Sequence, residues 1–106
     1  MKTAYNILPS GLEDIVEIYN YIGAERPNAA EKFFREVFNT IDNLAALPEM
    51  GKHFLSKNPK LNDIRFFPIH SFPRFLVFYR IKNRKLQVIH IYHDARNINA
   101  LFELNE

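Results

Sequence analysis

Cysteine and tryptophan are absent from this 106-residue sequence, and it contains only three glycines. Without cysteine the chain has no disulfide framework, no zinc–thiolate site and no thiol nucleophile. So few glycines also argue against a glycine-rich phosphate-binding loop. No apolar run approaches the roughly 20 residues that span a bilayer, so we expect no membrane association. Because no charged and then apolar leader follows Met1, we expect a cytoplasmic protein.

Charge is distributed unevenly along what we expect to be a single domain, residues 1–106. Residues 1–50 contain 4 Lys and Arg against 8 Asp and Glu, whereas residues 51–106 contain 10 against 4. The two halves therefore carry net charges of −4 and +6, and all four histidines lie in the basic half. A basic half indicates an anionic partner, either nucleic acid or an acidic protein segment, unless it is simply a solvated surface.

Two apolar segments on either side of a short polar break predict a β-hairpin. Residues 74–81 and 86–92 are rich in Phe, Val, Ile and Tyr and contain no Gly or Pro, which is typical of strands. A two-residue turn at Asn83–Arg84 would make Tyr79 face Val88 and Val77 face His90. Both faces of this hairpin are apolar at the centre, so we expect it to lie inside a larger sheet with one face fully covered.

The residues before the hairpin predict a strand followed by two helices. A weak alternation over residues 3–7 predicts a short strand that Pro9 ends. Apolar residues recur at helical spacing over about 11–24 and again up to about residue 47. The short corner between them predicts an antiparallel helical hairpin. Helix caps are expected from residue spacing at Ser10 with Glu13 and at Asn28 with Glu31.

The remaining segments complete an α+β pattern. Residues 51–62 are polar and predict a surface loop, and residues 63–69 predict a strand in which Pro68 favours a sheet edge. Asn97 is positioned to cap a last short helix, whose apolar side is expected to contain Ile98, Leu101, Phe102 and Leu104. The predicted order is β-α-α-β-β-β-α, with the helical hairpin packed on one face of a small antiparallel sheet.

A rim of polar side chains on or near the strand ends is the candidate functional site. RNA cleavage by attack of a 2′-hydroxyl needs a proton acceptor, a proton donor and cations, and these side chains could supply them without metal. The alternative is that the arginines pair with acidic groups and backbone carbonyls. His90 and His93 are expected on opposite faces of a strand, so we expect no metal site and no cofactor. The candidate residues are Arg65, Arg74, Tyr79, Arg80, His93 and Arg96.

Three segments, residues 64–68, 74–80 and 88–98, together resemble the ParE/RelE superfamily of bacterial toxins from type II toxin–antitoxin systems. The sequence looks closest to the ParE branch, and the helical segments also fit, so the resemblance covers nearly the whole chain. Its most specific part is Phe-Tyr-Arg at 78–80 followed by His-x-Ala-Arg at 93–96. The sequence departs from the family at His90, Asp94 and Asn97, where the family usually has arginine, glycine and aspartate.

The resemblance implies a toxin that arrests growth and stabilises plasmids, in a hetero-oligomer with a cognate antitoxin. The antitoxin would contribute an acidic or amphipathic segment that folds on binding, received by the basic sheet and by the groove beside the helical hairpin. ParE-like members inhibit DNA gyrase and have no active site of their own. The modest net charge and the acidic helical half favour this branch, in which all six candidate residues would be binding contacts.

Two alternatives remain open. RelE-like members are endoribonucleases that cut messenger RNA on the ribosome, and in that case the enzyme would be independent of metal. The residues that would then be catalytic are Arg65, Arg80, His93 and Arg96. The departures at His90, Asp94 and Asn97 also leave open an inactive relative that binds an antitoxin and does nothing else.

Overall fold

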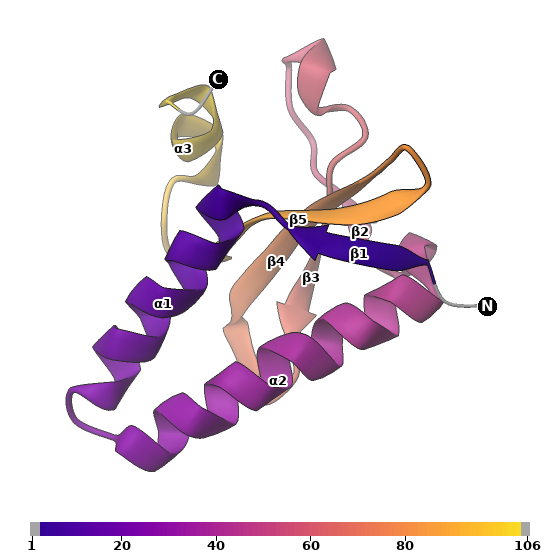
Figure 1. Cartoon of the computed structure of the whole chain (residues 1–106). Helices are drawn as coiled ribbons and strands as arrows, with labels where there is room; N and C mark the ends of the chain where they lie inside the picture. Colours follow the sequence, from indigo (N-terminus) through magenta and orange to yellow (C-terminus); the bar gives the residue numbers. More distant parts are fainter. Residues whose placement is uncertain (1–2, 105–106) are drawn as a thin grey trace.

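The computed structural model describes residues 3–104 and confirms the predicted α+β fold (Figure 1). The chain forms one sheet, two long helices and a short C-terminal helix, with two single-turn 3-10 helices at 48–50 and 59–61. The strands are β1 (Ala4–Ile7), β2 (Lys52–His53), β3 (Arg65–Ile69), β4 (Phe72–Lys82) and β5 (Lys85–His93), and the helices are α1 (Pro9–Gly23), α2 (Pro27–Ala46) and α3 (Ile98–Leu104).

The sheet has the strand order β1-β5-β4-β3-β2. Neighbouring strands from β2 to β5 are antiparallel, whereas β1 runs parallel to β5, with Ala4 opposite Lys85. The sheet is therefore mixed, and not antiparallel throughout as the sequence suggested. The alternation of residues within β1 carries no information on the direction of its partner, so the sequence pattern could not supply this detail.

The β4–β5 hairpin lies inside the sheet, as predicted, and its turn has the expected two residues. Asn83 and Arg84 have φ angles of 53° and 63°, which identify a tight turn of the type that favours hairpins. Tyr79 faces Val88 as predicted, but the register then shifts between Phe78 and Tyr79. Strand β3 is not the edge strand that Pro68 suggested, because the short β2 pairs with Arg65 and Phe66 outside it; Pro68 lies beyond that pairing.

The shift in register reverses the predicted faces of the last part of β5. Val77 faces Ile91, and Phe78 faces His90, so the expected pairing of Val77 with His90 is wrong. One extra residue in β5 forms a β-bulge, and a slip of one residue exchanges the two faces of every following position. Ile91 and His93 consequently face the long helices, whereas His90 and Tyr92 face the opposite side.

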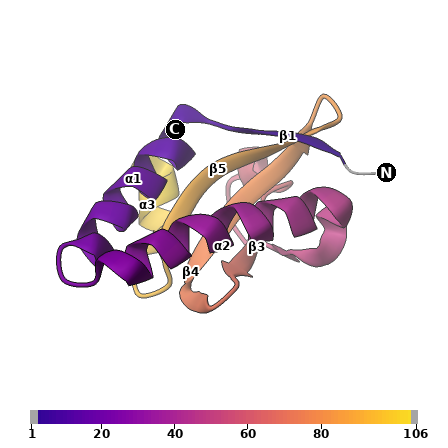
Figure 2. The same cartoon turned by 60° about the horizontal axis from the view of Figure 1, so that its bottom comes forward.

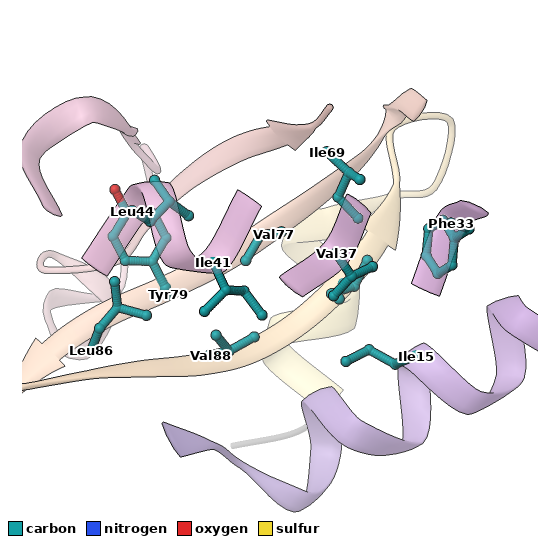
Figure 3. Close-up of a cluster of buried hydrophobic side chains, with 11 residues drawn as sticks. Ile15, Phe33, Val37, Ile41, Leu44, Ile69, Val77, Tyr79, Leu86 and Val88 are labelled. Atoms are coloured by element: carbon teal, nitrogen blue, oxygen red, sulfur yellow. The ribbon is translucent and has the colours of Figure 1, made fainter. Parts of the chain in front are cut away.

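Helix α2 covers one face of the sheet, as Figures 1 and 2 show. Its apolar side chains interdigitate with those of β4 and β5, and Ile15 from α1 joins them (Figure 3). Tyr79 is the largest fully buried side chain of this core. The buried members are Ile15, Phe33, Val37, Ile41, Leu44, Ile69, Val77, Tyr79, Leu86, Val88 and Ile91.

The other face of the sheet carries a second, smaller core. The segment 54–64 and helix α3 cover it, and Phe102 packs against the rings of Phe54, Phe78 and Tyr92. Segment 51–62 is therefore more than the predicted surface loop, because it buries Leu61 and contains the strand β2. Asn97 caps α3 as predicted, its Oδ1 accepting from the Ala100 amide at 3.2 Å. The side chain of Leu104 lies outside the described residues.

Both long helices begin at a proline, and neither predicted side-chain cap forms. Pro9 and Pro27 occupy the first turn of α1 and α2, where the missing N–H costs nothing. The predicted cap of Ser10 with Glu13 is wrong because the Ser10 hydroxyl donates instead to the Ile89 carbonyl at 2.6 Å. The cap at Asn28 is wrong because the helix has already begun.

Helix α1 completes the hydrogen bonding of β5 beyond the point where β1 ends. Ser10 satisfies the Ile89 carbonyl, and the Asp14 carboxylate accepts from the Ile91 amide at 3.0 Å. Gly11 makes this approach possible, since a Cβ there would lie 3.0 Å from the Val88 carbonyl oxygen. None of the helices in residues 3–104 is long and apolar enough to cross a membrane.

Candidate functional site

The six candidate residues lie at two different ends of the sheet. Arg65, Tyr79 and Arg80 line a depression of about 520 Å³ beside the turn end of the β4–β5 hairpin. His93 and Arg96 line a cleft of about 330 Å³ between α1 and the opposite end of the same strands. Arg74 lies at that second end, six positions before Arg80 on β4, which corresponds to about 20 Å. The structure therefore does not bring the six together in one site.

The arginines at the turn end bind backbone carbonyls of neighbouring turns. Arg65 donates from Nη1 to the carbonyl oxygens of Glu49 and Gly51, at 3.1 and 2.7 Å. Arg80 donates from Nη2 to the Lys60 carbonyl at 2.8 Å and to Asp63 Oδ1 at 2.9 Å. These contacts hold segments 48–51 and 59–63 against the sheet, which gives both arginines a structural task.

Tyr79 also has an internal role, because its side chain is fully buried. The hydroxyl donates to the Pro48 carbonyl at 2.6 Å and accepts from the Gly51 amide at 3.0 Å. Burial raises the pKa of this hydroxyl, against the smaller lowering effects of the Gly51 amide and the Arg65 charge. A hydroxyl with these partners and this pKa is poorly suited to donating a proton to a ligand.

The second end of the sheet contains the half-exposed ring of His93. Its Nδ1 accepts from the Ala95 amide at 3.0 Å, so in the neutral ring Nε2 carries the proton. Phe75 packs edge-on against the ring, with centroids 5.0 Å apart. Arg96 lies over the Tyr92 ring at 5.8 Å, and Arg74 pairs with Asp94 at 3.0 Å.

Carboxylates share the cleft that contains His93 and Arg96. Asp14 and Glu17 line it, together with the exposed Tyr21. Asp14 Oδ2 also lies 2.8 Å from His90 Nδ1, which ties α1 to β5. Two carboxylates beside one arginine make this cleft electrostatically unfavourable for a phosphodiester.

A second cluster of polar side chains joins α2 to the turn between β3 and β4. Glu36 accepts from His70 Nδ1 at 2.5 Å, from Ser71 Oγ at 3.1 Å and from Asn39 Nδ2 at 2.8 Å. The hydrogen bonds from His70 and then Asn39 lower the pKa of Glu36 to about 2. Ser71 approaches the same ring nitrogen as Glu36, at 3.2 Å, so this is not a serine–histidine–acid triad.

Sequence patterns assigned the outer apolar residues of α1 to helix packing, but the structure leaves several exposed. Leu12 and Val16 are 51% and 52% exposed, and Phe34 on α2 is 46% exposed. Val16, Tyr19 and Phe34 line a groove of about 450 Å³ between the two helices, bordered by Glu31 and Arg35. The signal in the sequence was an apolar stripe on α1 wider than one sheet face requires.

Metal binding has little support in the described part of the chain. Within residues 3–104 no three His, Asp or Glu side chains gather closely enough to hold a metal ion. His90 faces Phe102 and stacks on Tyr92 at 4.5 Å, whereas His93 faces the long helices. The two rings therefore point away from each other, as expected from their spacing.

Comparison with known proteins relates the chain to one family. The family model described as the ParE toxin of the type II toxin–antitoxin system parDE matches residues 5–98. No curated protein sequence matches the chain. A solved structure of a chromosomal ParDE toxin–antitoxin system from P. aeruginosa superimposes with a TM-score of 0.71 at 17% identity, covering 87% of this chain and 96% of the other. Because the family match covers most of the sequence, the chain belongs to the ParE toxin family of type II toxin–antitoxin systems.

Proposed function

We propose that this type II toxin acts by inhibiting DNA gyrase and that a cognate antitoxin neutralises it. Membership of the ParE family gives the toxin role. The observation that supports inhibition by protein contact, rather than RNA cleavage, is the separation of the candidate residues. Arg80 and His93 lie in different depressions at different ends of the sheet. General acid–base chemistry needs its groups within hydrogen-bond reach of one substrate.

Several candidate side chains already make contacts within the protein, which supports the same proposal. Arg65 and Arg80 bind carbonyl oxygens of the protein, and the Tyr79 hydroxyl is buried. A ribonuclease would need these groups free to neutralise the phosphate in its transition state. His93 does have an Nε2–H available, but Asp14 and Glu17 line its cleft. A gyrase inhibitor needs none of this chemistry and requires only a complementary surface.

The groove between α1 and α2 is the proposed receptor for the antitoxin. Leu12, Val16 and Phe34 supply an exposed apolar strip, which an amphipathic segment can bury on folding. Acidic residues predominate beside this strip, with Glu13 and Glu17 on one side and Glu31 next to Arg35 on the other. We therefore expect the bound antitoxin segment to combine an apolar face with flanking lysines or arginines.

Two reactions performed side by side test the target. Purified toxin is added to gyrase with relaxed plasmid and, separately, to a translating ribosome extract with a defined message. We expect cleaved linear DNA in the first reaction and intact message in the second. Cleavage of the message at codon boundaries with normal supercoiling would overturn the proposal, and no effect in either reaction would favour an inactive antitoxin-binding relative.

The variant His93→Ala separates the two mechanisms within the same assays. Gyrase inhibition moves no proton on the toxin, so the variant is expected to retain its activity. His53→Ala, which removes a ring at the other end of the sheet, is the matched control for loss of a histidine. Loss of all activity in folded His93→Ala, with full activity in the control, would contradict inhibition by contact alone.

A further inference from the structure

The turn end of the β4–β5 hairpin carries three cations that the protein itself does not neutralise. Lys82, Arg84 and Lys85 are all exposed. Among residues 3–104 none of the three has an ion-pair or hydrogen-bond partner for its side chain, although Arg74 and Arg80 are each paired with an aspartate. The hairpin end extends beyond β3 at one corner of the sheet (Figures 1 and 2), and the start of β1 lies beside Lys85.

Two features of the same turn are locally destabilising. Arg84 has a φ of 63°, in the left-handed region that favours glycine or asparagine and disfavours longer side chains. Lys82 and Lys85 form the last pair of the ladder and face each other directly, and like charges in that position repel. Residues held in a locally unfavourable conformation or charge arrangement, with no stabilising contact elsewhere in the protein, are expected at functional surfaces.

The positive surface continues from the turn into the adjacent depression of about 520 Å³. Arg84 lines this depression together with His53, Arg65 and Arg80. Its acidic members are Glu49 and Asp63, and Asp63 is already paired with Arg80. The unpaired charge is therefore concentrated at the hairpin end and decreases toward the interior of the sheet.

We propose that the basic hairpin end, defined as Lys82, Arg84 and Lys85, binds the phosphate backbone of duplex DNA. Phosphate contacts by lysine and arginine need exposed, unpaired cations and no apolar pocket. A two-stranded β-ribbon is also a shape that the major groove of B-DNA admits. An acidic peptide would need a cluster of apolar anchors beside the charges, whereas residues 82–85 supply none and the neighbouring Ile81 is a single exposed apolar side chain of β4.

This proposal goes beyond inhibition of gyrase, because a poison that acts by protein contact alone does not touch DNA. It is tested on the isolated toxin, so its outcome is independent of whether gyrase is the target. Binding of the full chain to a short fluorescent DNA duplex is followed by anisotropy over a series of salt concentrations. We expect binding that weakens as salt rises, with a logarithmic slope set by the number of phosphates contacted.

The test variant is the triple substitution Lys82→Gln, Arg84→Gln and Lys85→Gln. It is expected to weaken binding by about tenfold or more at low salt and to reduce the salt slope by about one for each cation removed. The matched control changes the same number of exposed cations elsewhere, with Arg26→Gln, Lys32→Gln and Lys57→Gln, and is expected to bind like the original chain. Lys82→Arg with Lys85→Arg keeps the charge and is expected to retain binding.

Three results would overturn the proposal. The first is no binding of duplex DNA at low salt, and the second is an equal loss of affinity in the triple variant and in its control. The third is a clear preference for single-stranded RNA or for an acidic peptide over the duplex. Circular dichroism and thermal unfolding of each variant show whether the fold is kept, and the charge-preserving variant distinguishes charge from turn geometry.

Discussion

At Gly51 the backbone passes so close to Tyr79 that a methyl group has no room. A Cβ at this position would lie 2.3 Å from the Tyr79 hydroxyl oxygen. The tyrosine cannot move away easily, since its ring is fully buried and its hydroxyl has two hydrogen bonds. We expect Gly51→Ala to lower the free energy of unfolding by about 1–3 kcal/mol, measured by urea denaturation.

Gly23→Ala is the matched control for that substitution. A Cβ added at Gly23 would have the Cβ of Ala30 as its nearest neighbour, at 3.4 Å, which is an ordinary contact. Alanine also favours the helix that ends at Gly23. The control is expected to be neutral or to stabilise by up to about 1 kcal/mol. The effects of Gly51→Ala and Tyr79→Phe should be non-additive, because removing the hydroxyl removes the closest contact and leaves only the ring carbons, at 2.9 Å from the added Cβ. Additive losses would contradict this explanation.

Glu36 is expected to make stability depend on acid pH. Hydrogen bonds from His70 and Asn39 lower its pKa from 4.5 to about 2. A carboxyl group whose pKa is lower in the folded state stabilises the fold above the unfolded pKa, and this contribution is lost as pH falls toward the folded pKa. Unfolding free energy should therefore fall between about pH 4.5 and pH 2.

Glu36→Gln should reduce the slope of stability with pH in that window, as measured by urea denaturation at several pH values. Glu25→Gln, which removes an exposed carboxylate from the corner between α1 and α2, is the matched control and should keep the original slope. If Glu36→Gln and the original chain lose stability in parallel over this range, the assignment of the pH dependence to Glu36 is wrong.

At the scale of elements, α3 is held to the sheet chiefly by one ring. Phe102 is 3% exposed and contacts four aromatic rings, those of Phe54, Phe78, His90 and Tyr92. We expect Phe102→Ala to lower the unfolding free energy by about 3–5 kcal/mol, because it removes transfer energy and leaves a cavity. Glu103→Ala on the same helix is exposed and should change little. Equal melting temperatures for the two variants would show that α3 is not docked.

The types and order of the elements could be predicted from the sequence, because periodicity and turn residues are local properties. The Asn83–Arg84 turn and the Asn97 cap were identified in this way. The bulge in β5 could not be predicted, since the extra residue, Ile89, is apolar and fits either register. Ser10 likewise has the residue type of a cap, but the unpaired edge of β5 is a tertiary feature that competes for its hydroxyl.

At the scale of the whole molecule, the candidate site could be predicted only in part. Sequence patterns placed Arg80 and His93 near strand ends, but the distance between those ends depends on how the strands are assembled. Whether an arginine is free or bonded to a carbonyl depends on loops that have no periodicity, such as the segments that Arg65 and Arg80 hold. The exposure of Val16 also depends on assembly, because α1 packs beside β5 whereas α2 crosses the face of the sheet (Figure 1).

The groove between α1 and α2 should separate neutralisation from toxicity. Val16→Glu places a charge in the proposed antitoxin receptor while leaving both cores untouched. We expect this variant to arrest growth like the original toxin but to resist neutralisation when it is co-expressed with the cognate antitoxin, with weaker binding by calorimetry. Asn28→Glu adds the same charge at an exposed helical position outside the groove and should still be neutralised. Normal neutralisation of Val16→Glu would place the antitoxin elsewhere.

The parallel pairing of β1 with β5 also bears on how this protein is made. Strand β1 is synthesised before β5 but pairs with it, so β1 has no partner strand until residues 85–93 follow. Contacts between such distant residues slow folding, and domains fold as units during synthesis. The nascent chain therefore cannot complete this sheet until residues 85–93 have emerged from the ribosome. Synthesis itself would then time the appearance of the finished toxin.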